Sequence, residues 1–201
     1  MIESEREPLL VTVESARVGD AEDVARVEVD CWRDTYPTLL PTEFLIRSLD
    51  HRQRAASRRH RLRRAADTTL VAVTGHPRNV VGFATFGACR LPTLPFGGEV
   101  FELYVLPDFR GAGVGRQLCA AVADRLLRTG TESLCVEVLE GNGSRFFYEA
   151  LGARLVARRD HQFAGTVLPT LVYGWPDLNA LVRRARGTSA PPAGLGKPPL
   201  S

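Results

Sequence analysis

Three closely spaced glycines behind an arginine form the stretch of this chain best suited to hold a phosphorylated ligand. The segment reads R-G-A-G-V-G over residues 110–115 and follows an apolar run, Glu99–Leu106, that ends at Pro107. Glycines let a backbone approach phosphate oxygens without an intervening Cβ, the first N–H groups of a helix attract anions, and arginine adds a planar cation. The pattern predicts a buried strand, a pyrophosphate-binding turn and an amphipathic helix.

Two common phosphate-binding motifs do not match this turn. A Walker A loop requires Gly-Lys-Ser/Thr, which is absent, and a dinucleotide-binding fingerprint reads G-x-G-x-x-G near the start of its domain. Here the spacing is G-x-G-x-G, and about half of the chain precedes it. The ligand is therefore expected to be a pyrophosphate compound of another kind.

A second group of residues follows at a short distance. Ser133–Leu139 predicts another buried strand, and the sequence Gly-Asn-Gly-Ser over residues 141–144 predicts a turn. Residues 145–151 (RFFYEAL) predict a short helix that ends at Gly152. A polar turn with Asn142 and a short helix with Tyr148 thus follow the first motif along the chain.

Together these motifs resemble those of the GNAT superfamily of acetyl-CoA-dependent N-acetyltransferases. R-G-x-G-V-G after a strand end, then N-x-x-x-F-F-Y-E-x-L-G after the next strand, occur here in the family's order. The resemblance covers roughly residues 10–178. It implies an α/β fold in which a central, mostly antiparallel sheet with a splayed parallel pair is flanked by helices. It also implies acetyl-CoA as co-substrate. No metal is expected, because the four histidines stand alone in the sequence.

The resemblance assigns cofactor contacts residue by residue. The strand edge at Leu103, Tyr104 and Val105 would pair with the pantetheine arm, backbone N–H groups near Val105 would polarise the thioester carbonyl, and Asn142 would contact the arm. The pyrophosphate would be held by Arg110, Gly111, Ala112, Gly113, Val114, Gly115 and Arg116. Tyr148 occupies the position where many family members keep the acid that protonates the departing CoA thiolate; its alternative role is aromatic packing.

Three glutamates are candidates for the base that takes the proton of the acceptor amine. Glu99 matches the strand position used by histone-type acetyltransferases, and Glu137 matches that used by ribosomal-protein alanine acetyltransferases. Glu102 faces the opposite side of a regular strand from Glu99, unless a bulge changes the alternation. We rank them Glu99, Glu137, Glu102.

The acceptor side is less well defined by sequence. In the family the first two helices and their connection border the acceptor site, which makes Trp32 and Tyr36 either substrate contacts or packing anchors. The acceptor is expected to be a primary amine of a small molecule, a peptide N-terminus or a lysine. The alternatives are a non-catalytic acyl-CoA sensor and an interaction module built on the same fold.

The remaining segments alternate between strand and helix patterns. Helices are expected over Ala21–Arg33 and over Arg52–Arg64, whose seven arginines suggest a solvated basic face or, alternatively, a site for an acidic partner or the CoA 3′-phosphate. Further strands are expected at Leu9–Ser15, Thr68–Thr74, Val80–Cys89, Arg154–Arg159 and Val167–Trp175, with a loop over Asp160–Gly165.

Composition indicates one soluble domain. The 201 residues are 44% hydrophobic with a net charge of +3, too modest to predict nucleic-acid binding, and no long apolar segment predicts membrane insertion or secretion. Four scattered cysteines indicate reduced core residues and a cytoplasmic location. We expect a domain over 1–182, a disordered tail over 183–201, and a monomer or a homodimer that uses an edge strand near Val167–Trp175.

Overall fold

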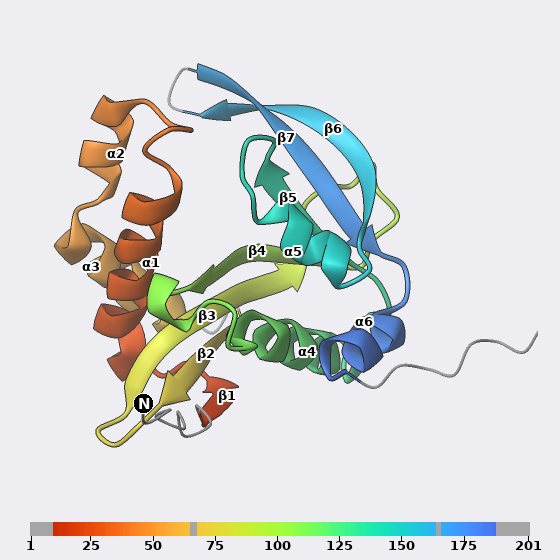
Figure 1. The fold of residues 1–201 in the computed structure, drawn as a ribbon, viewed down its shortest axis with the longest axis horizontal. Helices are drawn as coiled ribbons and strands as arrows, with labels where there is room; N and C mark the ends of the chain where they lie inside the picture. The colour runs from red at the N-terminus through yellow and green to blue at the C-terminus, as the bar shows by residue number, and fades with distance from the viewer. Residues whose placement is uncertain (1–9, 65–67, 164–165, 188–201) are drawn as a thin grey trace, which may run out of the picture.

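A twisted sheet of seven strands organises the chain (Figure 1). The computed structural model describes residues 10–64, 68–163 and 166–187. The strand order is β1-β2-β3-β4-β5-β7-β6, and every neighbouring pair is antiparallel except β4 and β5. The strands are β1 (Val11–Ser15), β2 (Thr68–Thr74), β3 (Asn79–Ala88), β4 (Gly98–Val105), β5 (Leu134–Leu139), β6 (Arg154–Phe163) and β7 (Thr166–Trp175). The mixed α/β architecture with one parallel pair is thereby confirmed.

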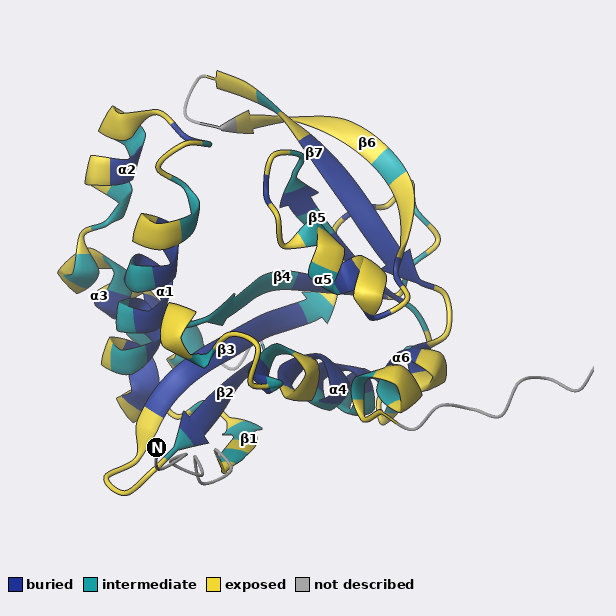
Figure 2. Cartoon of the chain, in the orientation of Figure 1, coloured by how far each residue is buried: buried dark blue, intermediate teal, exposed yellow. Residues whose placement is uncertain are grey.

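Helices cover both faces of this sheet. Those on one side are α1 (Ala21–Thr35), α2 (Thr42–Ser48) and α3 (His51–Arg64), and those on the other are α4 (Val114–Leu127), α5 (Arg145–Ala150) and α6 (Leu178–Ala185). Short 3₁₀ turns, η1 (Val18–Asp20) and η2 (Pro107–Phe109), precede α1 and α4. The central strands are buried, whereas β6 is largely exposed (Figure 2).

Helical spacing of apolar residues explains how α4 and α1 dock. Leu118 and Val122 of α4 are fully buried in the larger core, and Val24 and Val27 of α1 are fully buried against β2 and β3. Burial of each such side chain contributes about 1.5–3 kcal/mol relative to exposure. These two cores fix the sheet between its helical layers and hold the ends of β4 and β5 in place.

The parallel pair separates soon after it begins. β4 and β5 pair only at Gly98–Val100 against Leu134–Val136. Beyond that point Phe101–Val105 and Glu137–Leu139 have no ladder between them, although β4 remains paired with β3 and β5 with β7. The gap exposes backbone groups of β4 along the edge that the sequence assigns to the pantetheine arm.

A bulge in β4 changes the side-chain alternation there. Thr85 pairs with Glu102 and the next residue, Phe86, pairs with Val100, which leaves Phe101 as the extra residue. Glu99 and Glu102 therefore lie on the same face of the sheet, because their β3 partners are two residues apart. Glu137 shares that face, since Glu99 pairs with Cys135, two residues before it.

Several predicted boundaries are corrected. A helix, α2, occupies the segment between α1 and α3 where none was expected. β6 continues to Phe163 through most of the expected loop Asp160–Gly165, and α6 runs to Ala185, so the predicted disorder does not hold for residues 183–185. Arg186 and Gly187 form a turn after α6, and residues 188–201 of the expected tail lie outside the described residues.

The expected dimer edge is also corrected. β7, which contains Val167–Trp175, lies between β5 and β6 and is paired with β5 over Thr170–Trp175 and with β6 over Thr166–Gly174. Among the described residues the edge strands of the sheet are β1 and β6. β7 is therefore not the edge strand that was expected.

The arginine-rich helix α3 is not a purely solvated basic face. Arg58 is buried and its guanidinium donates to Glu28 of α1 at 2.7 and 3.0 Å and to Glu102 of β4 at 2.6 and 2.7 Å. Arg54 also pairs with Glu28. This cluster joins α1, α3 and β4, so two of the arginines serve the fold rather than an external acidic partner.

Candidate active site

A cavity of about 1010 Å³ lies where β4 and β5 separate. It is lined by residues from α1, β4, the turn before α4, β5, α5 and β7. Of the residues selected from the sequence, those lining it are Trp32, Tyr36, Glu99, Glu102, Leu103, Tyr104, Val105, Arg110, Gly111, Gly113, Val114, Gly115, Arg116, Glu137, Asn142 and Tyr148. Ala112 is the selected residue that does not line it. The fold thus brings residues from distant parts of the sequence into one space.

The glycine turn has the backbone geometry of an anion cradle. Gly111 and Gly113 have φ angles of 77° and 83°, and a Cβ built on either meets no described atom within 4 Å. Their backbone conformation, rather than crowding, therefore requires glycine. Gly113 immediately precedes α4, whose first N–H groups carry the positive end of the helix dipole.

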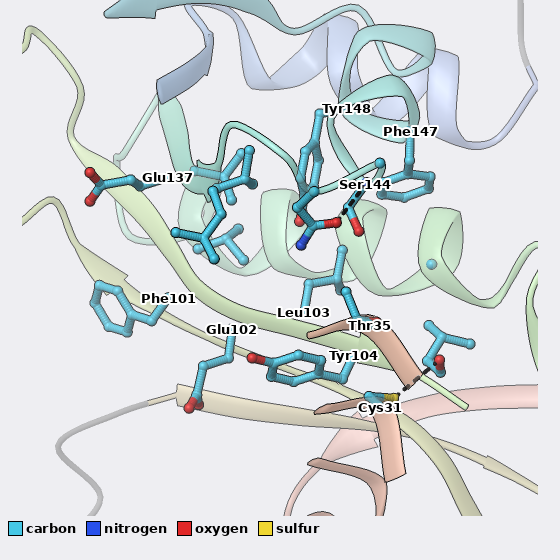
Figure 3. A pocket seen from close by; sticks show the side chains of 18 of the residues that line it. Cys31, Thr35, Phe101, Glu102, Leu103, Tyr104, Glu137, Ser144, Phe147 and Tyr148 are labelled. Atoms are coloured by element: carbon cyan, nitrogen blue, oxygen red, sulfur yellow. Dashed lines mark hydrogen bonds between the residues drawn. The ribbon is translucent and has the colours of Figure 1, made fainter. Parts of the chain in front are cut away.

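Close packing accounts for the third glycine of the turn. A Cβ on Gly115 would lie 3.1 Å from the Phe147 ring of α5. The start of α4 and the start of α5 therefore lie in direct contact where both line the cavity. Figure 3 shows Phe147, Ser144 and Tyr148 together on this side of the pocket.

The two arginines of the turn differ in their surroundings. Arg110 donates through Nε to the Val105 carbonyl at 3.2 Å and pairs with Asp34 of α1, so its guanidinium is turned toward α1. Arg116 is exposed, lines the cavity and has no ion pair within the described part of the chain. Arg116 is thus the arginine with more freedom to meet an incoming phosphate.

Tyr148 is buried in the wall of the cavity. Its ring packs edge-on against Trp175 and Phe147, with centroid distances of 5.9 and 5.3 Å. Burial raises the pKa of Tyr148 well above its ordinary value, with smaller contributions from Cys119 and Tyr36. The hydroxyl therefore keeps its proton at neutral and moderately basic pH. Tyr148 therefore packs against other aromatic rings and also lines the cavity.

Aromatic and polar residues connect α1 to the two separated strands. Trp32 Nε1 donates to the Tyr104 hydroxyl at 2.8 Å, and the Trp32 and Tyr36 rings lie 5.0 Å apart. Burial raises the pKa of Tyr36, while hydrogen bonding to Tyr104 and Asn142 opposes the rise. Asn142 also accepts from the Ser144 N–H at 2.9 Å, which fixes the turn after β5.

Glu102 is committed to the arginine cluster. Burial raises the pKa of Glu102, but its hydrogen bonds to Arg58 and the charges of Arg58 and Arg61 outweigh that effect, and the net pKa is lowered. The same cluster raises the pKa of Arg58 despite its burial. Both groups are ionised at neutral pH, and both oxygens of Glu102 accept from Arg58.

Glu99 and Glu137 have different partners. Glu99 is 2% exposed and is held by Arg90, which donates from its backbone N–H at 2.8 Å and from its guanidinium at 2.6 and 3.2 Å. Glu137 accepts from the Thr170 hydroxyl at 2.6 Å, and the Arg159 guanidinium is 4.0 Å away. Its side chain is 18% exposed. Figure 3 shows Glu137 extending on the opposite side of the pocket from Phe147.

Sequence reasoning missed Thr170 and His161, which line the same cavity, and expected the loop that starts at Arg90 to be long enough to border a site without selecting Arg90 itself. Arg90 belongs to the connection after β3, and the other two come from β7 and β6, outside both motifs. The strand pairing brings β7 beside β5, so Thr170 faces Glu137. A polar threonine among the apolar residues of β7 was the available signal for that contact.

Residues 10–64, 68–163 and 166–187 contain no group of three or more histidines, cysteines or acidic residues placed to hold a metal ion. Among the same residues, no helix is both long and apolar enough to cross a membrane.

Sequence and structure comparisons agree on the class of protein. Residues 22–153 match the Acetyltransferase (GNAT) family, and the chain belongs to that family. The N-acetyltransferase YuaI of Bacillus subtilis, itself uncharacterized, is 35% identical over 172 residues, which cover 86% of this chain and 96% of YuaI.

Solved structures share the fold at lower identity. A GNAT-family protein from Desulfovibrio desulfuricans is 19% identical with a TM-score of 0.63, over 84% of this chain and 99% of its own. The yncA protein of Salmonella typhimurium, solved with its cofactor acetyl-CoA, is 20% identical with a TM-score of 0.61, over 84% and 94%. The family resemblance predicted from the two motifs is confirmed.

Proposed function

We propose that this protein transfers an acetyl group from acetyl-CoA to a primary amine by direct attack of the amine on the thioester. The main observation behind the proposal is that the glycine turn, the separated strands β4 and β5, Tyr148 and Glu137 all line one cavity. Family membership supports the reaction class, and the acetyl-CoA in the related yncA structure supports the donor.

The chain's own groups fit such a donor. The N–H groups at the start of α4, preceded by Gly111 and Gly113, would bind the pyrophosphate, with Arg116 adding charge. The free edge of Phe101–Val105 would pair with the amide groups of the pantetheine arm as a neighbouring strand would. Asn142, at the turn after β5, borders the same path.

Glu137 is the base that we favour. Glu99 and Glu102 each have both oxygens bonded to an arginine. Glu137 instead accepts from the neutral Thr170 hydroxyl, and its arginine neighbour, Arg159, is 4.0 Å away. An alkylammonium has a pKa of ~10.4 in water, so a base near the cavity must take its proton before attack. The choice of Glu137 as the base differs from the ranking made from the sequence, which placed Glu99 first.

Tyr148 is the group that we propose meets the departing sulfur. Glu137 takes the first proton of the ammonium and passes it to solvent. As the C–N bond forms and the C–S bond breaks, Tyr148 gives its proton to the sulfur and regains one from the nitrogen, which loses its second proton. The products are the acetylated amine and the free thiol. The raised pKa of Tyr148 keeps its hydroxyl available as a donor at the pH where the amine reacts.

The test is thiol release from acetyl-CoA in the presence of a panel of primary amines, with the acetylated product identified by mass spectrometry. The panel should include polyamines, amino acids, amino acid amides and short peptides. Amine-dependent thiol release with one acetylated product per thiol would support the proposal. A folded protein that binds acetyl-CoA but acetylates no amine would instead support a non-catalytic acyl-CoA sensor.

A further inference from the structure

The loop after β3 presents a fixed guanidinium to the acceptor side of the cavity. Arg90 makes three hydrogen bonds to Glu99, from its backbone N–H, Nε and Nη2. Glu99 is 2% exposed, whereas the Arg90 side chain is 63% exposed and lines the cavity. A buried carboxylate thus holds one side of the guanidinium and leaves its other N–H groups facing the open space.

Phe101 fixes the guanidinium from a second direction. The Arg90 guanidinium carbon lies 3.9 Å from the centre of the Phe101 ring, which comes from the bulge of β4. An arginine held by a carboxylate and a ring has already lost most of its side-chain freedom before a ligand arrives. Its planar, fixed N–H groups then suit a carboxylate of the ligand.

The surroundings place Arg90 on the same side as the proposed base. Its hydrogen bond to Glu99 raises the pKa of Arg90, burial lowers it, and the charges of Glu99, Glu102 and Glu137 add to the rise. Glu99, which holds Arg90, and Glu137 lie on the same face of the sheet, on the two neighbouring parallel strands. Figure 3 shows Phe101, on which Arg90 stacks, and Glu137 on the side of the pocket away from Phe147.

We infer that the acceptor is a primary amine that also carries a carboxylate, with Arg90 binding the carboxylate and Glu137 facing the amine. The inference rests on the proposed function, because it concerns the second substrate of that reaction. A ligand with a second ammonium group, such as a polyamine, would meet the Arg90 cation unfavourably. A simple alkylamine has no anionic group and would make no ionic contact with Arg90, whose partner would remain Glu99. Arg90 is thus a specificity-determining residue, and amino-acid-like acceptors are the substrate class.

The test uses matched pairs of acceptors and two variants. The acceptors are the common L-amino acids and their carboxamides, which differ in the anionic group. Arg90→Gln removes the cation but leaves Glu99 buried without its partner, so Arg90→Gln/Glu99→Gln, which replaces the ion pair with two neutral amides, accompanies it. Arg158→Gln is the control, because Arg158 is 70% exposed, pairs with Glu140 and does not line the cavity.

The measured quantity is the ratio of kcat/KM for an acid to kcat/KM for its amide. The wild type and Arg158→Gln should favour acids by about tenfold to a hundredfold, as expected for a hydrogen bond between charged groups. In the double variant the ratio should fall to about one, because activity on acids drops far more than activity on amides. An unchanged ratio in the double variant, or a wild type that favours amides, would overturn the inference alone. No acetylation of any acceptor would overturn the proposed function, and the inference with it.

Discussion

Arg58 of α3 and Glu102 of β4 are joined by two hydrogen bonds, of 2.6 and 2.7 Å, although they are 44 residues apart in the sequence. The same guanidinium reaches Glu28 of α1, and it lies over the Phe83 ring at 4.9 Å. This contact ties the helical layer to the strand that forms the cavity wall. It also occupies one of the three glutamates suited by position to accept a proton.

Removal of Arg58 should destabilise the fold strongly. Arg58→Ala leaves Glu28 and Glu102 buried without their shared cation, and breaking a buried ion pair in this way costs about 3–5 kcal/mol. Urea unfolding followed by circular dichroism measures the loss. Arg59→Ala is the control, because Arg59 pairs with Glu22 at the surface and should cost at most about 1 kcal/mol. Equal losses in the two variants would contradict the structural role of Arg58.

Acid should weaken the wild type more than Glu102→Gln. Arg58 lowers the pKa of Glu102 in the folded protein despite burial, so the folded state binds fewer protons at this site than the unfolded state. The resulting stability is present above the ordinary unfolded pKa of about 4.3 and is lost as pH falls through the lower folded value. Urea midpoints measured between about pH 6 and pH 3 should therefore fall more steeply for the wild type. Parallel curves would mean that Glu102 does not titrate with folding.

Glu137→Gln should lower turnover without weakening acetyl-CoA binding. Loss of a general base costs about 10²–10⁴-fold in kcat, and the deficit should shrink as pH rises toward the pKa of the amine, because less proton removal is then required. Steady-state kinetics across pH and calorimetry with acetyl-CoA give the two quantities. Glu140→Gln, which alters an exposed pair with Arg158, is the matched control. A large loss in Glu99→Gln with none in Glu137→Gln would return the role of base to Glu99.

Tyr148→Phe should lower kcat by about tenfold or more while the Kd for acetyl-CoA stays within about twofold, because the hydroxyl acts as the sulfur departs. Ring packing against Trp175 is retained in this variant. Tyr173→Phe is the control, since the Tyr173 hydroxyl donates to Glu149 at 2.6 Å and does not line the cavity. Normal turnover by Tyr148→Phe would assign protonation of the sulfur to water.

The part of the fold that sequence predicts well is the part with strong local signals. β4, the glycine turn and α4 combine an apolar strand, residues that need positive φ and a helical apolar face, and the structure has all three. The bulge at Phe101 could be anticipated only as a possibility. It depends on pairing with β3, and it decides that Glu99 and Glu102 share a face.

Signals that were missed were short or masked by composition. α2 has only seven residues and begins directly after Pro41, in a segment for which no helix was expected. In α6, Leu178 and Leu181 are fully buried and Asp177 accepts from the Asn179 N–H at 2.8 Å, a capped amphipathic pattern hidden next to an arginine-rich, proline-rich end. The burial of Arg58 could not be read from α3 itself. Its signal was Glu28, a buried acid on the apolar side of α1.

Nearly all of the residues selected from the sequence for acetyl-CoA line the cavity, whereas the selection for the acceptor was incomplete. The residues proposed to contact acetyl-CoA are consecutive in two motifs, so sequence alone could propose them. Arg90 and Thr170 reach the cavity through tertiary pairing, from a loop and from β7. That difference explains why the donor was clear from sequence and the acceptor was not.

Calorimetric titration with acetyl-CoA tests the central claim most directly, using wild type, Gly113→Val and Gly130→Val. Gly113 and Gly130 flank α4, have φ angles of 83° and 79°, and leave open space for a Cβ, so the two substitutions strain the backbone similarly. Gly113 lines the cavity and Gly130 does not. Wild type and Gly130→Val should bind with a Kd in the range of about 1 μM to 1 mM, and Gly113→Val at least about tenfold more weakly. No binding to folded wild type, or equal binding by Gly113→Val, would contradict the account.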